Sequence, residues 1–424
     1  MNGALNLTQT SPTEVNVKLT FFSDVIHPRI AAVICFIAIP VNLLHIRILM
    51  SPRLRHLSIS VVLAAIAVCD IGTMTSCVTF LLHFRLNQVS SYADYCQWIE
   101  STYSQGWVKF VPYHASVTVW LHSASIWLCV SLCVLRYLTL RSADDPKVTW
   151  LKFSTGMHTS LATFATTIPV MVMAYFMHEV DEVSSVYARG HDRECMKWDQ
   201  ASAHAPIQVH TTRYSSIVMD NECLVLKIYL IVIGILFKLV PCAILLLCSV
   251  LLLAKLRNIF QLRPVHQQHQ TPPDTTALVI GVAVVFVLTE LPQGAVMLIS
   301  VARICTIDTN VYDNTGDALD LLSLTNSATT LLLSMALAPA YRRAATESVL
   351  YDSQALLRPI MLRLRHIVTS QTGVASPPLL NQACEMQQQQ RLAVVRHSMP
   401  VTTSAQITKP DRSTDSLSGP IVWL

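Results

Sequence analysis

Three ionisable residues stand inside long, mostly apolar stretches of this sequence: Asp70, Lys238 and Glu290. Glu290 lies two residues before Pro292, in the run Ala277–Ile304. A charged group inside a lipid bilayer is costly and is usually retained for a function. Each of the three is therefore a candidate for binding a ligand or an ion.

Lys238 lies three residues before Pro241, at a depth similar to that of Glu290. A buried ammonium group needs a partner or loses its proton. We weigh an ion pair between Lys238 and Glu290 against the alternative that each is hydrated separately in a water-filled cavity. Proline removes a backbone hydrogen bond from a helix, so we expect kinks at Pro241 and Pro292.

Asp70 is expected to face the interior of the protein and bind a cation; the alternative is a carboxyl group satisfied by neighbouring hydroxyls. His114 and His122 are about two turns apart on one helix face. With no paired acid on that helix, they are expected to line a pocket or pack rather than bind a metal. No catalytic Ser/His/Asp or Cys/His spacing and no glycine-rich phosphate loop stands out, so we do not expect an enzyme.

The chain has 424 residues, of which 52% are hydrophobic and 13% charged. A soluble protein carries roughly twice that share of charge. Apolar stretches of about 20 residues can cross a bilayer. We predict an all-α membrane protein, a seven-transmembrane helix bundle, with spans at Ile30–Met50, Ile59–Leu82, Val111–Leu138, Leu151–Met177, Leu224–Leu253, Ala277–Ile304 and Ala318–Leu337.

Basic residues gather after every second predicted span. They follow the first, third, fifth and seventh spans: Arg47, Arg53, Arg55, Arg136, Arg141, Lys147, Lys152, Lys255, Arg257, Arg263, Arg342 and Arg343. Short basic loops face the cytoplasm, so the N-terminus is predicted outside and the C-terminus inside. The net charge of +4 reflects this asymmetry and does not indicate a nucleic-acid partner.

Three parts of the chain are expected. Residues 1–26 form an extracellular segment without a cleaved signal peptide and with a glycosylation sequon at Asn6. Residues 27–343 form the membrane domain, and residues 344–424 a cytoplasmic tail. In the tail, Ala345–Val368 has the composition of a helix on the membrane surface, followed by a disordered segment.

The loops Leu86–Phe110 and Glu179–Glu222 are long enough to cover a pocket mouth. Each holds a cysteine on the predicted oxidising side, Cys96 and Cys195, and these two are candidates for a disulfide. Cys223 is a rival partner, since connectivity does not follow from sequence.

Together these features resemble a rhodopsin-like G-protein-coupled receptor, with Arg136-Tyr137 closing the third span. More narrowly, three runs are similar to the myosuppressin-receptor-like FMRFamide peptide receptors and to the nematode serpentine receptors of class W. The runs are Ser125-Ile126-Trp127-Leu128, Lys238-Leu239-Val240-Pro241-Cys242 and Thr289-Glu290-Leu291-Pro292-Gln293-Gly294. The resemblance covers about Ile30 to Arg343.

The resemblance implies a plasma-membrane receptor for an amidated FMRFamide-like neuropeptide that couples to a heterotrimeric G protein, with arrestin as a partner of the tail. Arg136 and Tyr137 would contact the G protein, or Arg136 would lock the inactive state; physics alone also allows Arg136 to be a snorkelling cap. A sodium ion is the one cofactor implied, at the positions of Asp70, Ser125, Asn326 and Ser327.

The arginine of such a peptide needs an acid, and Glu290, Asp317 and Asp320 are the candidates. If Lys238 neutralises Glu290, the two aspartates are favoured. The ligand-binding set is expected to comprise Glu290, Lys238, His122, Gln293, Asp317 and Asp320.

The sequence also departs from the receptor pattern. Leu135 replaces an acid, Val111 replaces a cysteine, and the seventh span has Thr330, Leu331 and Ser334 where asparagine, proline and tyrosine are usual. These departures leave a decoy receptor as one alternative. The others are a chemosensory receptor for a small molecule and a seven-span transporter, which would usually show paired repeats that this sequence lacks.

Overall fold

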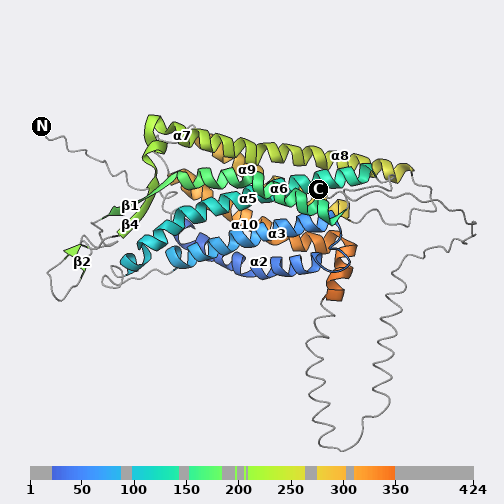
Figure 1. Cartoon of the computed structure of the whole chain (residues 1–424), viewed down its shortest axis with the longest axis horizontal. Coiled ribbons are helices and arrows are strands. Elements are labelled where there is room, and N and C mark those ends of the chain that lie inside the picture. Colours follow the sequence, from blue (N-terminus) through green and yellow to red (C-terminus); the bar gives the residue numbers. More distant parts are fainter. Residues whose placement is uncertain are drawn as a thin grey trace, which may run out of the picture. The chain divides into compact units, whose positions relative to one another are not determined.

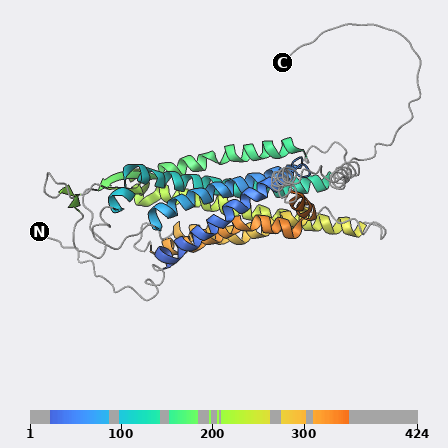
Figure 2. The ribbon, with the colours of Figure 1, turned by 90° about the horizontal axis from the view of Figure 1, so that it is seen from below.

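A computed structural model of the chain describes residues 22–86, 98–142, 152–183, 196–197, 205–206, 209–262, 275–301 and 310–348. Long helices run side by side in a bundle through these residues (Figures 1 and 2). The helices are α2 (His27–Leu49), α3 (Ser58–Phe80), α5 (Gln105–Arg141), α6 (Phe153–Phe176), α7 (Ser216–Gly234), α8 (Val240–Leu262), α9 (Thr275–Val301) and α10 (Asn310–Leu337). Three π-helical turns extend or join them: η1 (Phe22–Ile26), η2 (Leu81–Arg85) and η3 (Ile235–Leu239).

The predicted seven-helix membrane bundle is confirmed. Six helical segments of the described chain are long and apolar enough to cross a bilayer, and α7, η3 and α8 count as one of them. A seventh is reached when Gly316–Leu337 is taken together with Pro339–Ser348, to which it is bent by 102°. Large apolar side chains such as Leu247, Leu288 and Leu332 lie exposed on the outside of the bundle, which suits lipid rather than water.

Helix α5 is the centre of the bundle. It packs against α3, α6, α8 and α9, and its residues Ile126, Leu128 and Leu132 are fully buried in the largest core cluster. It begins at Gln105, earlier than the predicted Val111, because Gln105, Gly106 and Lys109 lower the hydropathy of its first turns without interrupting the helix.

The turn η3 lies one helical turn before Pro241. Proline has no amide hydrogen to donate to the preceding turn, and a widened π turn is a common way for a helix to accommodate that loss. Opposite η3, Gly294 of α9 lets the two segments approach closely. A Cβ atom on Gly294 would lie 2.9 Å from Cβ of Lys238. Pro292 lies within α9, which is one unbroken helix.

The segment between α6 and α7 contains strands, which the all-α prediction did not include. β1 (His178–Val183) pairs antiparallel with β4 (Val209–Tyr214), and β2 (Met196–Lys197) with β3 (Ala205–Pro206). Arg213 on β4 forms an ion pair with Asp181 on β1. These strands are short and polar, so they lack the apolar alternation by which strands are usually predicted.

The domain boundary between residues 343 and 344 stays a prediction; the helix Pro339–Ser348 runs across these two residues. Pro339 suits the first turn of a helix and follows the end of α10 directly. The surface helix predicted over Ala345–Val368 shares residues 345–348 with this helix, and the rest of it lies outside the described residues.

Three predicted residues, Asn6, Cys96 and Cys195, also lie outside the described residues. Cys223 is disulfide-bonded. Every other described cysteine is free, so its partner is outside the described part of the chain.

Candidate functional site

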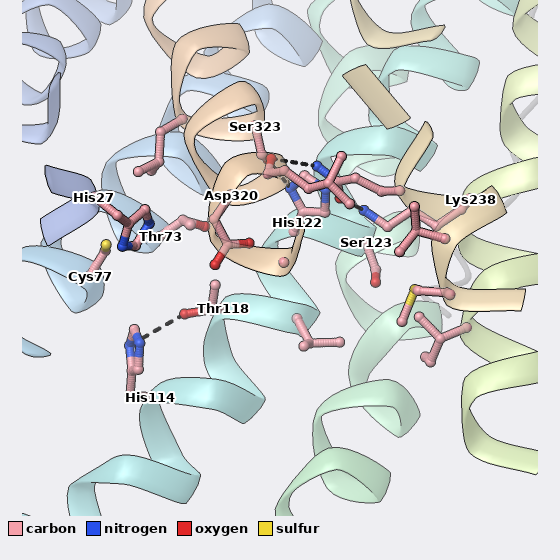
Figure 3. Close-up of a pocket in the computed structure, with 18 residues that line it drawn as sticks. His27, Thr73, Cys77, His114, Thr118, His122, Ser123, Lys238, Asp320 and Ser323 are labelled. Atoms are coloured by element: carbon pink, nitrogen blue, oxygen red, sulfur yellow. Dashed lines mark hydrogen bonds between the residues drawn. The ribbon is translucent and has the colours of Figure 1, made fainter. Parts of the chain in front are cut away.

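A cavity of about 280 Å³ opens among the helices (Figure 3). Its walls come from α2, α3, α5, α7, η3, α9 and α10, and comprise His27, Thr73, Cys77, His114, Thr118, Val119, His122, Ser123, Ile233, Lys238, Gln293, Val296, Met297, Gly316, Leu319, Asp320, Ser323 and Leu324. Ligand pockets usually measure about 300 to 1,000 Å³. This cavity therefore suits a small molecule or the last one or two residues of a peptide.

Glu290 does not line the cavity but lies behind two residues that do, His122 and Lys238. Its side chain is 0% exposed, and its Oε2 atom accepts hydrogen bonds from Nε2 of His122, at 2.8 Å, and from Nζ of Lys238. The structure thus pairs Lys238 with Glu290, as the first of the two alternatives predicts. A carboxylate can only accept hydrogen bonds, so Nε2 of His122 carries a proton.

The pair belongs to a longer hydrogen-bond network, most of whose members line the cavity. Lys238 Nζ also donates to Oε1 of Gln293 at 2.7 Å, and Gln293 Nε2 donates to the backbone oxygen of Leu319 at 3.1 Å. Oγ of Ser323 lies 3.4 Å from Nδ1 of His122. The network connects α5, η3, α9 and α10, so a rearrangement of these four elements must break or exchange buried polar contacts.

The two aspartates of the predicted ligand set are on α10. Asp320 is exposed to the cavity, whereas Asp317 lies beside it, with Oδ1 3.9 Å from Nδ1 of His27. The sequence did not predict His27, because it precedes the first predicted span. His114 lines the same cavity, where Nδ1 lies 2.7 Å from Oγ of Ser76.

Asp70 and Ser327, two residues of the predicted sodium site, are in direct contact. Oγ of Ser327 donates to Oδ1 of Asp70 at 2.9 Å. Oδ2 of Asp70 and Oγ of Ser125 are buried and have no hydrogen-bond partner, while Asn326 is also buried. A buried oxygen without a partner is costly, and oxygen atoms are the ligands that small hard cations prefer. The unpartnered oxygens of Asp70 and Ser125 suit such a cation chemically, and the sodium ion stays a prediction.

Arg136 is buried near the end of α5, with 5% of its surface exposed. This burial argues against the alternative of a snorkelling cap. Its Nε atom donates to Oγ1 of Thr276 at 2.9 Å, which ties α5 to the first turn of α9. Tyr137, next to it, packs against the core.

Two contacts that the sequence did not predict hold the same end of the bundle. Nδ1 of His45 on α2 lies 2.7 Å from the hydroxyl of Tyr341 in the helix Pro339–Ser348. Thr276, the partner of Arg136, was missed as well. Both contacts join residues far apart in the chain, so no local pattern signals them.

Comparisons with known proteins agree with this architecture. The model of the family described as serpentine type 7TM GPCR chemoreceptor Srw matches residues 29–351, which include most of each helix and of the cavity wall. The chain is 24% identical to the G-protein coupled receptor dmsr-1 of Caenorhabditis elegans over 370 residues, covering 78% of this chain and 69% of that protein. The resemblance to nematode serpentine receptors of class W is thereby confirmed.

Proposed function

This chain belongs to the serpentine type 7TM GPCR chemoreceptor Srw family, and we propose that its ligand is an amidated FMRFamide-like neuropeptide. Membership of this receptor family, which is not an enzyme family, makes it a multi-pass protein of the plasma membrane. It also implies an extracellular ligand and coupling to a heterotrimeric G protein. The peptide ligand is supported by the chemistry of the cavity.

The proposal depends on Glu290 being buried and paired, because this leaves another acid to bind the peptide. The charge of Glu290 is matched by Lys238 within hydrogen-bonding distance, and Glu290 has no exposed surface to offer a ligand. Among the described residues that line the cavity, Asp320 is the one acid. A guanidinium group binds a carboxylate through charge-assisted hydrogen bonds, so Asp320, with Asp317 beside it, is the proposed partner of the peptide arginine.

The rest of the cavity suits the terminus of such a peptide. Val296, Met297, Leu319 and Leu324 give it apolar walls that would take an aromatic side chain. The volume of about 280 Å³ excludes a whole peptide, so the preceding residues would bind outside the cavity.

Signal transmission would use both ends of α9. A ligand shifts a conformational equilibrium only by its differential affinity for the two states. In the proposed mechanism the ligand favours an arrangement of η3 and α9 in which the contacts of Lys238 and Gln293 are exchanged. At its other end α9 would then move away from α5, and the hydrogen bond between Thr276 and Arg136 would break. Arg136 and Tyr137 would then both contact the G protein. A sodium ion held by Asp70 would favour the state before this change.

The remaining proposals follow from charge and composition. The N-terminus with its sequon at Asn6 lies outside, the C-terminal tail lies in the cytoplasm, and arrestin would bind that tail. Cys96 and Cys195 lie on the outer side, where Cys223 competes with them as a disulfide partner.

The substitution Asp320→Asn tests the proposed recognition. Loss of hydrogen bonds between charged groups costs about 1.5 to 3 kcal/mol, which is about a 10- to 100-fold loss of peptide potency. The readout is peptide-stimulated nucleotide exchange on the G protein, with surface expression measured in parallel. Asp220→Asn is the matched control, since Asp220 is exposed on α7 and does not line the cavity. Unchanged potency in Asp320→Asn and in Asp317→Asn would overturn the assignment.

A receptor for a small molecule is the second candidate, favoured by the small volume of the cavity and by the chemoreceptor description of the family. Asp320 would then select a small cationic compound. A response to such amines, together with no response to amidated peptides in the same cells, would establish this candidate.

A further inference from the structure

One end of the cavity brings together a histidine and two aspartates from different helices. His27 is the first residue of α2, and Asp317 and Asp320 are three residues apart on α10. One possible ligand atom from each residue lies within 4.8 Å of the others. Figure 3 shows Asp320 between His27 and His122, with Lys238 on the opposite side of the cavity from His27. We propose that these three residues bind a divalent transition-metal cation, Zn²⁺.

The state of the His27 ring is the first argument. Its residue is 8% exposed, and both ring nitrogens are buried without a hydrogen-bond partner. A neutral imidazole has one N–H donor and one acceptor nitrogen, and leaving both unpaired in a buried position is costly. The contact of Nδ1 with Oδ1 of Asp317 at 3.9 Å is too long for a hydrogen bond. A cation at the acceptor nitrogen would satisfy it.

The geometry is the second argument. Residues three apart on a helix lie on the same face, which brings both carboxylates to the ring. Zinc binds nitrogen and oxygen at about 2.0 to 2.2 Å, so neighbouring ligands in a tetrahedral site are about 3.3 Å apart. Nδ1 of His27 and Oδ1 of Asp317 are 3.9 Å apart, and all three ligand atoms lie within 4.8 Å of one another, so side-chain movements must close these gaps. Asp320, which is exposed to the cavity, has room for such a movement. The fourth position would face the cavity, open to water or a ligand.

The ligand types select the metal. Imidazole suits zinc and its neighbours in the transition series, whereas calcium takes six to eight oxygen ligands. The positive charge of Arg85 interacts electrostatically with His27 and repels a cation there. The two negative charges of Asp317 and Asp320 exceed this one positive charge, so the cluster as a whole attracts a cation. Three protein ligands with one open position is an arrangement that zinc commonly adopts.

A consequence for signalling rests on the function proposed above. If Asp320 also binds the peptide arginine, zinc and peptide compete for the same carboxylate. Zinc should then lower the apparent potency of the peptide without changing the maximal response at saturating peptide.

The binding itself is tested on the full chain, purified without a histidine tag and titrated with ZnCl₂ by calorimetry. Because the chain contains other histidines and cysteines, the readout is the difference between variants. We expect saturable zinc binding, and each of His27→Ala and Asp320→Asn should lower the zinc affinity by at least about tenfold. Loss of a residue that only hydrogen-bonds a metal ligand already lowers metal affinity about 10- to 100-fold, so loss of the ligand itself should cost at least as much. His114→Ala, which removes a histidine of the same cavity outside the cluster, should retain zinc affinity.

Zinc affinity equal to that of the wild type in both His27→Ala and Asp320→Asn would overturn the proposal. If His27→Ala does not fold, Asp320→Asn decides, because its side chain is exposed to the cavity. A second arm measures peptide potency with and without zinc. If zinc binds but leaves peptide potency unchanged, the metal site stands and the proposed contact of the peptide arginine with Asp320 is refuted. The two proposals can therefore be refuted independently.

Discussion

The buried pair of Lys238 and Glu290 predicts that its two members are unequally sensitive to substitution. In Lys238→Met, the carboxylate of Glu290 keeps only His122, at 2.8 Å, and has no exposed surface through which water could reach it. Removing one member of a buried ion pair costs about 3 to 5 kcal/mol when the other charge is left uncompensated.

Glu290→Gln should cost less. Lys238 keeps its hydrogen bond to Gln293 at 2.7 Å and lines the cavity, where water can solvate it. The loss is then closer to that of one hydrogen bond to a charged group, about 1.5 to 3 kcal/mol. Peptide potency should be nearly unchanged in this variant, because Glu290 does not line the cavity.

The assay is the thermal unfolding midpoint of purified receptor in a bilayer mimic. The expected order is Lys238→Met below Glu290→Gln below wild type, and the double variant should lose less than the sum of the single losses. Glu347→Gln is the control, because it breaks an exposed ion pair with Arg53. The side chains of Arg53 and Glu347 are 47% and 50% exposed, and such a pair contributes about 0 to 1 kcal/mol to stability. Additive losses, or a larger loss in Glu290→Gln, would refute the description of the pair.

Three further predictions concern other parts of the bundle. Thr276→Val removes an acceptor of Arg136 and should raise basal nucleotide exchange by up to about 10- to 100-fold, since a hydrogen bond to a charged group is worth about 1.5 to 3 kcal/mol; unchanged basal exchange would argue against a lock. Asp70→Asn should abolish any effect of sodium concentration on agonist affinity, and a retained sodium effect would place the ion elsewhere. Gly156→Ala should destabilise the fold by about 1 to 3 kcal/mol, because its Cβ would lie 2.6 Å from the backbone oxygen of Ser58, whereas Gly106→Ala, with no atom within 4 Å, should not; equal unfolding midpoints would contradict this.

The helices could be predicted from the sequence because a membrane span is a local signal, a long apolar stretch between polar segments. The same signal identified Asp70, Lys238 and Glu290 as exceptions within such stretches. It was less accurate at helix ends, where polar residues such as Lys109 extend the helix without adding hydropathy.

What the sequence did not predict depends on contacts between distant segments. His27 lies ahead of the first apolar run, so its place beside Asp317 follows only from the packing of α2 against α10. Thr276 is an ordinary residue at a helix start until Arg136 is seen to reach it. Glu290 is likewise kept from the cavity surface by a long-range contact, the close approach of η3 to α9 at Gly294.

The central claim is that this receptor responds to an amidated RFamide-type peptide through a G protein. It is tested most directly by nucleotide exchange in cells that express the chain and are challenged with a panel of such peptides. The account predicts a saturable response that is lost in Arg136→Ala at equal surface expression. No response to any peptide of the panel, with the receptor present at the cell surface, would contradict it. Binding of labelled peptide to the same cells would then indicate a decoy receptor, and no binding would indicate a receptor for a small molecule.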